Sequence, residues 1–201
     1  MIVIDIETSG TDPHKHSILS IGAVDFSDPK RQFYQECRIE EGKEYEEEAL
    51  KVNGFKKGEL NDSSKKSLEM ILNEFVEWIK PIEDKTVGGH NVHFDVGFLN
   101  YSFKRYNINF SFGHRTVDTH SLVYASVLSR DLKIPLKDGK TAIDSDYVST
   151  YTGLPPEPKP HNALNGAKIE AESLSRLIFG RNLLDEYRKY EIPRYLLRDD
   201  R

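Results

Sequence analysis

The sequence has almost no cysteine and no long apolar run. The lone cysteine, Cys37, cannot form a disulfide within the chain, which agrees with a reducing compartment. No stretch approaches the roughly 20 apolar residues that a helix needs to cross a bilayer. The first residues also lack the charged, apolar and small-residue regions of a secretory signal. These absences predict a cytoplasmic protein.

A net positive charge is also missing. The formal charge is −5 at pH 7, from 28 lysine and arginine residues against 33 aspartate and glutamate residues. This balance disfavours a protein that coats nucleic acid tightly by non-specific electrostatic attraction. It leaves room for an enzyme that holds one strand end in a local cleft where metal ions supply the positive charge. The 201 residues suit one domain with a sizeable core.

The segment Ile2–Gly10 carries two acids where a buried strand should be apolar. Side chains alternate across a strand, so Asp5 and Glu7 project from the same face. Two carboxylates side by side in a buried strand repel each other and lose hydration, unless a cation lies between them. Mg²⁺ and Mn²⁺ prefer such oxygen ligands. If the strand instead ends at Ile4, both acids are solvated, and the strand alone does not decide between the two interpretations.

Apolar periodicity predicts an initial run of strands and then helices that alternate with short strands. Strand character is found in 17–26, 32–39, 86–88 and 116–118, with a turn at Asp28–Pro29 between the first two. Helical spacing is found in 67–80, 94–106 and 119–129, and in a last long helix after His161. The order of these elements predicts an α/β fold with a mixed sheet flanked by helices.

Two further segments connect these elements. The acidic stretch 40–48 is expected to be the solvated start of a helix. The proline-rich segment 154–160 is expected to be a loop that leads His161 into the last helix. The apolar face of that helix is predicted to contain Ala163, Ala167, Ala171, Leu174 and Ile178.

Three segments that lie far apart in the sequence are candidates to meet at one end of this sheet. They are Asp5-Ile6-Glu7, the glycine-rich turn and helix start at 89–95, and the helix entry at His161. Taken alone, Asp95 in a first helical turn is explained by the helix dipole, and a lone histidine by an ordinary structural role. Asp118, which precedes Thr119, is explained as a helix cap.

Together the three segments resemble the DnaQ-like 3′–5′ exonucleases, the DEDD superfamily with a catalytic histidine, which includes the proofreading subunit of DNA polymerase III, RNase T and oligoribonuclease. The resemblance extends to about Phe179. It rests on Asp5-x-Glu7-Thr8-Ser9-Gly10 and on His90-Asn91 with Phe94-Asp95. It implies an RNase H-like fold, with an exonuclease domain at 1–180 and a basic C-terminal tail at 181–201 that packs on the domain or extends from it.

The resemblance also implies a chemistry, the hydrolysis of phosphodiester bonds from the 3′ end of single-stranded DNA or RNA. Two divalent ions, Mg²⁺ or Mn²⁺, would be held by Asp5, Glu7 and Asp95. His161 would take the proton from the attacking water, because the unperturbed pKa of imidazole lies near working pH. The terminal nucleotide would be held by Thr8, Ser9, Gly10, Thr11, Asn91 and Phe94. The alternative for Phe94 is a core position, and a second copy of the chain or a polymerase is left open as a partner.

One position departs from the family pattern. The third motif is His-x-Ala-x-x-Asp, and here His161 and Ala163 are followed by Gly166 in place of the acid. Glycine in a helix interior costs about 0.5–1 kcal/mol relative to alanine, so it is not there for helix stability. The loss of a metal ligand predicts an impaired exonuclease. The alternative is a catalytically inactive relative that binds nucleic-acid ends or a protein partner. Glu170, about 5.4 Å further along the helix, is an acid that reaches the site only through a water.

Overall fold

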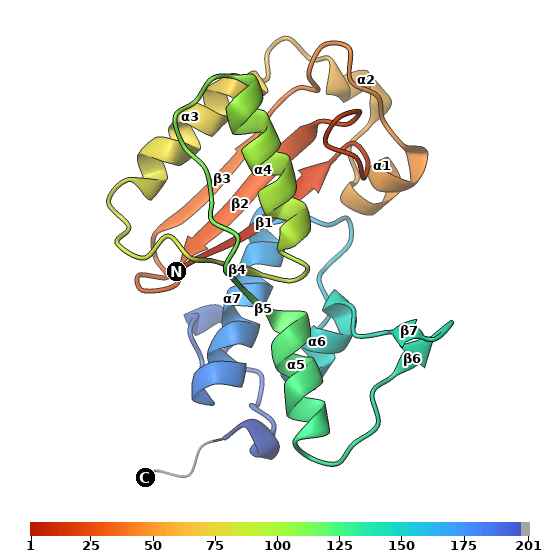
Figure 1. Ribbon diagram of the computed structural model, residues 1–201, viewed down its shortest axis with the longest axis vertical. Coiled ribbons are helices and arrows are strands. Elements are labelled where there is room, and N and C mark those ends of the chain that lie inside the picture. The colour runs from red at the N-terminus through yellow and green to blue at the C-terminus, as the bar shows by residue number, and fades with distance from the viewer. Residues whose placement is uncertain (198–201) are drawn as a thin grey trace.

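A mixed five-stranded sheet forms the centre of the computed structural model, which describes residues 1–197. The strand order is β3-β2-β1-β4-β5 (Figure 1). The first three strands pair antiparallel, whereas β4 and β5 run parallel to β1. This arrangement confirms the predicted α/β fold with a mixed sheet. The strands are β1 Ile2–Thr8, β2 Ile18–Asp25, β3 Gln32–Glu36, β4 Val87–Gly89 and β5 Thr116–Asp118.

The four predicted helices are present with bounds close to those expected. Asp118 caps α5 by accepting a hydrogen bond from the backbone N–H of His120, which confirms its interpretation as a cap. In the same way the side chain of Asn162 accepts from the N–H groups of Leu164 and Asn165 at the start of α7. These helices are α3 Leu68–Ile79, α4 His93–Arg105, α5 Thr119–Leu128 and α7 Ala163–Phe179.

The sequence analysis did not predict several short elements. A two-stranded hairpin projects from the body of the molecule (Figure 1). The short helix α6 follows it and packs against α5 and α7. The unpredicted elements are α2 Lys57–Leu60, β6 Leu136–Lys137, β7 Lys140–Thr141, α6 Ser145–Tyr151 and the 3-10 turns Asp185–Tyr187 and Arg194–Leu196. Among residues 1–197, no helix is both long and apolar enough to cross a membrane.

Helices cover both faces of the sheet (Figure 1). The even-numbered residues of β1, Ile2, Ile4 and Ile6, pack in the core with α3 and α4. Val3 packs with α7 on the other face. Because side chains alternate along a strand, Asp5 and Glu7 share the α7 face with Val3. The prediction that the two acids project from one face is therefore confirmed.

The start of α7 lies directly on β2. A Cβ atom added to Gly22 would lie 2.1 Å from the backbone carbonyl of Ala163, so only glycine permits this contact. The apolar face of α7 packs on the sheet as predicted, with Ala163, Ala167, Ala171 and Leu174 buried. The close contact fixes the N-terminal end of α7, and with it His161, beside the end of β1.

The prediction that the acidic stretch 40–48 is the solvated start of a helix is wrong in part. The helix α1, Glu47–Asn53, begins only at the end of this stretch, and Glu40 is buried rather than solvated. The carboxylate of Glu40 accepts a hydrogen bond from the hydroxyl of Tyr106 at 2.8 Å and pairs with Arg105 at 3.0 Å. The end of α4 thus supplies the partners that the buried acid requires, and no local sequence pattern shows this.

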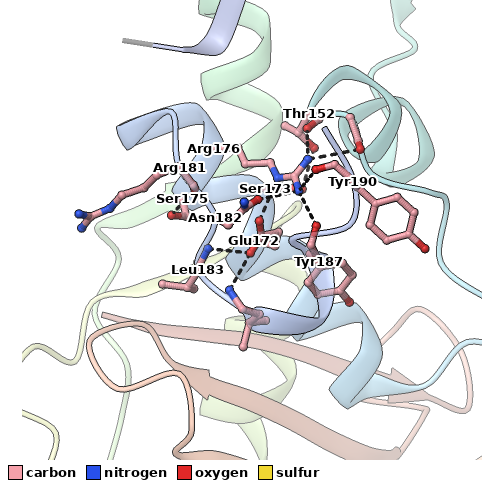
Figure 2. A network of polar contacts seen from close by, with 12 residues as sticks. Thr152, Glu172, Ser173, Ser175, Arg176, Arg181, Asn182, Leu183, Tyr187 and Tyr190 are labelled. Carbon is pink, nitrogen blue, oxygen red and sulfur yellow. Dashed lines mark hydrogen bonds and ion pairs between the residues drawn. The ribbon is translucent and has the colours of Figure 1, made fainter. Parts of the chain in front are cut away.

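The chain after α7 is held by a buried ion pair, Glu172–Arg176 (Figure 2). Both side chains are 0 % exposed, and their charged atoms lie 2.9 Å apart. The guanidinium donates to the carbonyl oxygens of Thr152, Tyr187 and Tyr190 and to the side chain of Asn182. The second oxygen of Glu172 accepts from the N–H groups of Leu183 and Leu184.

This network ties residues 182–190 to α7 and to the end of α6. The last four residues of the tail predicted at 181–201, residues 198–201, lie outside the described part of the chain. The domain boundary at 180 stays a prediction.

Candidate active site

A cavity of about 160 Å³ lies between the end of β1 and the N-terminal half of α7. It brings together Asp5, Glu7 and His161, which the sequence analysis selected from two distant segments. Three further acids line it, of which Glu157 and Glu170 lie inside and Asp146 is exposed. No lysine or arginine is among its lining residues within the described part of the chain. The remaining lining residues are His90, Thr119, Ser145, Val148, Ser149, Gly166, Ile169 and Ser173.

The two acids of β1 line this cavity, and their surroundings oppose ionisation. Burial, followed by the charges of Glu170 and Asp95, raises the pKa of Asp5 well above its ordinary value. Burial and the charges of Glu157 and Asp95 raise the pKa of Glu7 to about 8. Each of these carboxyl groups therefore resists ionisation unless a positive charge enters the site.

Asp95 approaches β1 from the opposite side. It is buried in the first turn of α4, and its Oδ1 accepts a hydrogen bond from the backbone N–H of Ile6 at 3.0 Å. Burial raises the pKa of Asp95 to about 8, although the hydrogen bond from Ile6 favours the ionised form. The helix dipole alone does not explain this residue, because its carboxylate is tied to the strand between Asp5 and Glu7.

His161 is accompanied by an acid that the sequence analysis missed. Oε2 of Glu157 lies 3.4 Å from Nδ1 of His161, and Oε1 accepts from the backbone N–H of Asn162 at 2.9 Å. Donor atoms of Glu7, Glu157 and His161 all lie within 4.8 Å of one another. Burial raises the pKa of Glu157, against the opposing effects of Asn162 and His161. The signal in the sequence was a lone acid in the proline-rich loop, four residues before the histidine.

Gly166 leaves space that the carboxylate of Asp5 fills. A Cβ atom added to Gly166 would lie 2.0 Å from Oδ2 of Asp5. Any side chain at position 166 therefore requires Asp5 to rotate. The obstructing atoms belong to the side chain of Asp5 and not to the backbone of the strand, so the rotation is the movement that makes room.

Glu170 lies one turn beyond Gly166 on the same face of α7, and it lines the same cavity. Its Oε2 is buried and has no hydrogen-bond partner among the described residues. A Cβ atom added to Gly89 would lie 3.1 Å from this oxygen, so the carboxylate lies against the end of β4. Burial and the charge of Asp95 raise the pKa of Glu170 well above its ordinary value, while the backbone of His90 lowers it.

This donor set fits a divalent cation. Several carboxylates converge on a small cavity, and one buried carboxylate oxygen has no partner. Burying a charge without a compensating group is costly, and oxygen-rich sites of this kind suit hard cations such as Mg²⁺ and Mn²⁺. The observation that carries the fit is Oε2 of Glu170, the one carboxylate oxygen among the described residues that is fully buried without a hydrogen bond.

The residues predicted to hold a nucleotide occupy two places. Thr8, Ser9 and Gly10 follow Glu7, but the hydroxyl of Ser9 is buried between Ser17 and Glu44, and that of Thr8 donates to the carbonyl of Gly10. These side chains serve the local fold, and so does much of the backbone, because the carbonyl of Thr8 accepts from Asn53 and the backbone of Ser9 bonds to Ser17 and Glu46. Thr11 is exposed.

Asn91 and Phe94 line a separate groove of about 820 Å³. Phe94 is 38 % exposed and its ring lies 4.9 Å from that of Phe98, so the alternative of a core position is wrong. The same groove is lined by one arginine and three histidines, and by the acid Asp118; the basic residues are His93, His114, Arg115 and His120. The structure therefore does not bring Asn91 and Phe94 into the acidic cavity itself.

Comparisons with known proteins agree with this arrangement. The family model RNase T, described as exonuclease, matches residues 2–172. The chain is 33 % identical over 183 residues to the 3′-5′ DNA exonuclease Cap18 of Escherichia coli, which covers 88 % of this chain and 90 % of that protein. It is 34 % identical over 187 residues to DNA polymerase III subunit epsilon of Rickettsia typhi, covering 90 % of this chain and 74 % of that protein.

Solved structures show the same fold at lower identity. The nuclease domain of 3′hExo, a DEDDh family member bound to rAMP, superposes with a TM-score of 0.66 at 15 % identity, covering 96 % of this chain and 94 % of that one. This similarity confirms the predicted RNase H-like fold. The family match across residues 2–172 and the two relatives show that the chain belongs to this exonuclease family, as a DnaQ-like member.

Proposed function

We propose that this protein removes nucleotides from the 3′ end of single-stranded nucleic acid in a metal-dependent reaction. The observation that carries the proposal is the cavity in which Asp5, Glu7 and His161 converge, with Asp95 tied to the strand between the two acids. Cap18, a relative along most of the chain, is named a 3′-5′ DNA exonuclease, which favours DNA over RNA as the substrate.

The acids define where the cation binds. Exonucleases of this family depend on divalent metal ions, and Asp5, Glu7 and Asp95 are the residues that would hold them, as two Mg²⁺ or Mn²⁺ ions. When bound, such ions supply positive charge to the scissile phosphate and lower the pKa of the attacking water. The raised pKa values of the acids follow from burial and mutual repulsion, both of which a cation offsets.

His161 is the residue that takes a proton. Glu157 faces Nδ1 of the imidazole, which leaves Nε2 to accept the proton from the attacking water. The carboxylate of Glu157 then stabilises the imidazolium that forms. Glu157 thus acts by positioning His161 and by supporting its charge.

The terminal nucleotide would lie between the two places described above. Within residues 8–11, the backbone N–H groups of Gly10 and Thr11 are the ones that the local fold leaves free. The half-exposed ring of Phe94 offers a flat face on which a base stacks. Asn91, Arg115 and His120 line the groove beside that ring, so the strand would leave the cavity across it. A second copy of the chain or a polymerase stays a predicted partner.

Gly166 is expected to slow the reaction. Loss of one partner around a metal typically costs about 10–100-fold in affinity or activity. Gly166→Asp is the direct test of the missing carboxylate, and Gly166→Ala is its control, because alanine displaces Asp5 without adding an oxygen. Gly166 is also the observation that favours the second candidate function, an inactive relative that binds nucleic-acid ends or a protein partner.

The experiment follows 5′-labelled single-stranded DNA and RNA on a denaturing gel in Mn²⁺ or Mg²⁺. We expect a ladder that shortens from the 3′ end, stops with EDTA and is absent in Asp5→Asn. DNA should be cut faster than RNA. End binding that persists in EDTA, without any cleavage by the protein or by Gly166→Asp, would instead establish the inactive binder.

A further inference from the structure

The fourth carboxylate of the site is missing at position 166, but the cavity is not short of acids. Asp5 leans into the volume above Gly166, where its Oδ2 occupies the place of a side chain. The carboxylates that remain in the cavity wall are those of Glu157, Asp146 and Glu170. Their contacts decide which of them is free to bind a cation.

Two of these acids are poorly suited to replace the missing one. Glu157 is engaged through both oxygens, one with the N–H of Asn162 and the other with His161. Asp146 is exposed at the edge of the cavity, where water screens its charge. Asp118, nearby at the end of β5, uses both oxygens to accept from the backbone at His120 and Val92.

Glu170, in contrast, has a carboxylate oxygen that is shielded from water and that no other described group engages. Its Oε2 is buried and receives no hydrogen bond from the described residues, which is costly for a carboxylate oxygen. Helical side chains lean toward the N-terminus of their helix, and glutamate is one methylene longer than aspartate. Both properties allow Glu170 to extend toward the turn that contains Gly166, with which it lines the same cavity.

The neighbouring strand leaves room for this carboxylate. A Cβ atom at Gly89 would lie 3.1 Å from Oε2 of Glu170, which is tighter than ordinary contact. Glycine at the end of β4 therefore allows the carboxylate to lie between α7 and the sheet. The acid, the gap at 166 and the glycine at 89 occur together in one small volume.

We propose that Glu170 supplies to the metal site the carboxylate that position 166 lacks, so that the site is displaced by one helical turn rather than lost. This inference rests on the proposed function of the same cavity. It makes Glu170 a metal ligand of this chain, which partly offsets the carboxylate that position 166 lacks.

The test measures Mn²⁺ affinity by calorimetry and by the rise in melting temperature that Mn²⁺ produces, without any substrate. Glu170→Gln should weaken Mn²⁺ binding by about tenfold or more, the range typical of a lost partner at a metal. Asp146→Asn removes a charge of the same sign from the rim of the same cavity, and it should change the affinity by less than about threefold.

The decisive variant combines Glu170→Gln with Gly166→Asp. It should regain Mn²⁺ affinity, because the carboxylate returns at position 166 once Asp5 rotates away. Circular dichroism in EDTA checks that Glu170→Gln folds. The inference would be overturned by any of three results. They are an unaltered Mn²⁺ affinity in Glu170→Gln, no Mn²⁺ binding by the wild type, and no recovery of Mn²⁺ affinity in the double variant.

The two proposals fail in different ways. Cleavage by the wild type together with an unaltered Mn²⁺ affinity in Glu170→Gln would refute the role of Glu170 and leave the exonuclease standing. Mn²⁺ binding that depends on Glu170, without cleavage of any 3′ end, would support the role of Glu170 and refute the exonuclease.

Discussion

The replacement Arg176→Met should destabilise the protein strongly. Arg176 and its partner Glu172 are both 0 % exposed, and the guanidinium also donates to three backbone carbonyl oxygens (Figure 2). Methionine fills most of the volume but leaves the charge of Glu172 buried with only two backbone N–H donors. Removing one partner of a buried ion pair costs about 3–5 kcal/mol.

This loss converts to a large change in melting temperature. For a chain of this size, each kcal/mol lowers the melting temperature by about 2–4 °C, so the expected drop is about 6–20 °C. The segment 182–197 should detach first, because the guanidinium holds its carbonyl groups. Thermal denaturation followed by circular dichroism measures the first effect, and limited proteolysis with mass spectrometry locates the second.

Arg188→Met is the matched control. Arg188 pairs with Asp185 at 2.8 Å, but its side chain is 72 % exposed. Exposed ion pairs are worth about 0–1 kcal/mol, so the control should lower the melting temperature by no more than about 4 °C. Equal effects of the two substitutions would refute the argument that burial gives the Arg176 pair its importance.

Two further predictions concern the acids and the groove. In EDTA, the free energy of unfolding should fall as the pH rises from about 5.5 to 8.5. The pKa values of Glu7 and Asp95 are raised to about 8 in the folded protein. In this pH range the folded protein therefore binds more protons than the unfolded chain, and it loses that advantage as the pH rises. Melting temperatures across the range measure this, and a flat or rising profile would contradict it. Phe94→Ala should weaken binding of single-stranded DNA by about 5–150-fold, the worth of one stacked base, as fluorescence anisotropy would report. An unaltered affinity would show that no base stacks on this ring.

Local patterns predicted the elements that carry the site. The apolar spacing of α3 and the Asp118 cap of α5 are properties of neighbouring residues, so they are visible in the sequence. Alternation along β1 placed both acids on one face, and the structure confirms it. The hairpin β6–β7 and helix α6 carry little periodic burial, and Leu136 is 65 % exposed, so no pattern indicated them.

Contacts between distant segments could not be predicted in this way. Glu40 is buried because Tyr106, 66 residues away, donates to it, and the acidic run around it pointed to solvent. Glu157 contacts His161 because of the path that the proline-rich loop takes, and a loop has no apolar periodicity from which its path could be predicted. The free oxygen of Glu170 depends on the packing of α7 against β4, and a sequence alone shows only that an acid stands one turn beyond Gly166.

The most direct test of the account compares the rates at which this protein and its Gly166→Asp variant shorten 5′-labelled single-stranded DNA in Mn²⁺. The account predicts that both shorten the strand from the 3′ end, with the aspartate variant faster by about tenfold or more. It also predicts that Asp5→Asn abolishes cleavage in either background. Absence of cleavage by both proteins would contradict the assignment of this cavity as an exonuclease site.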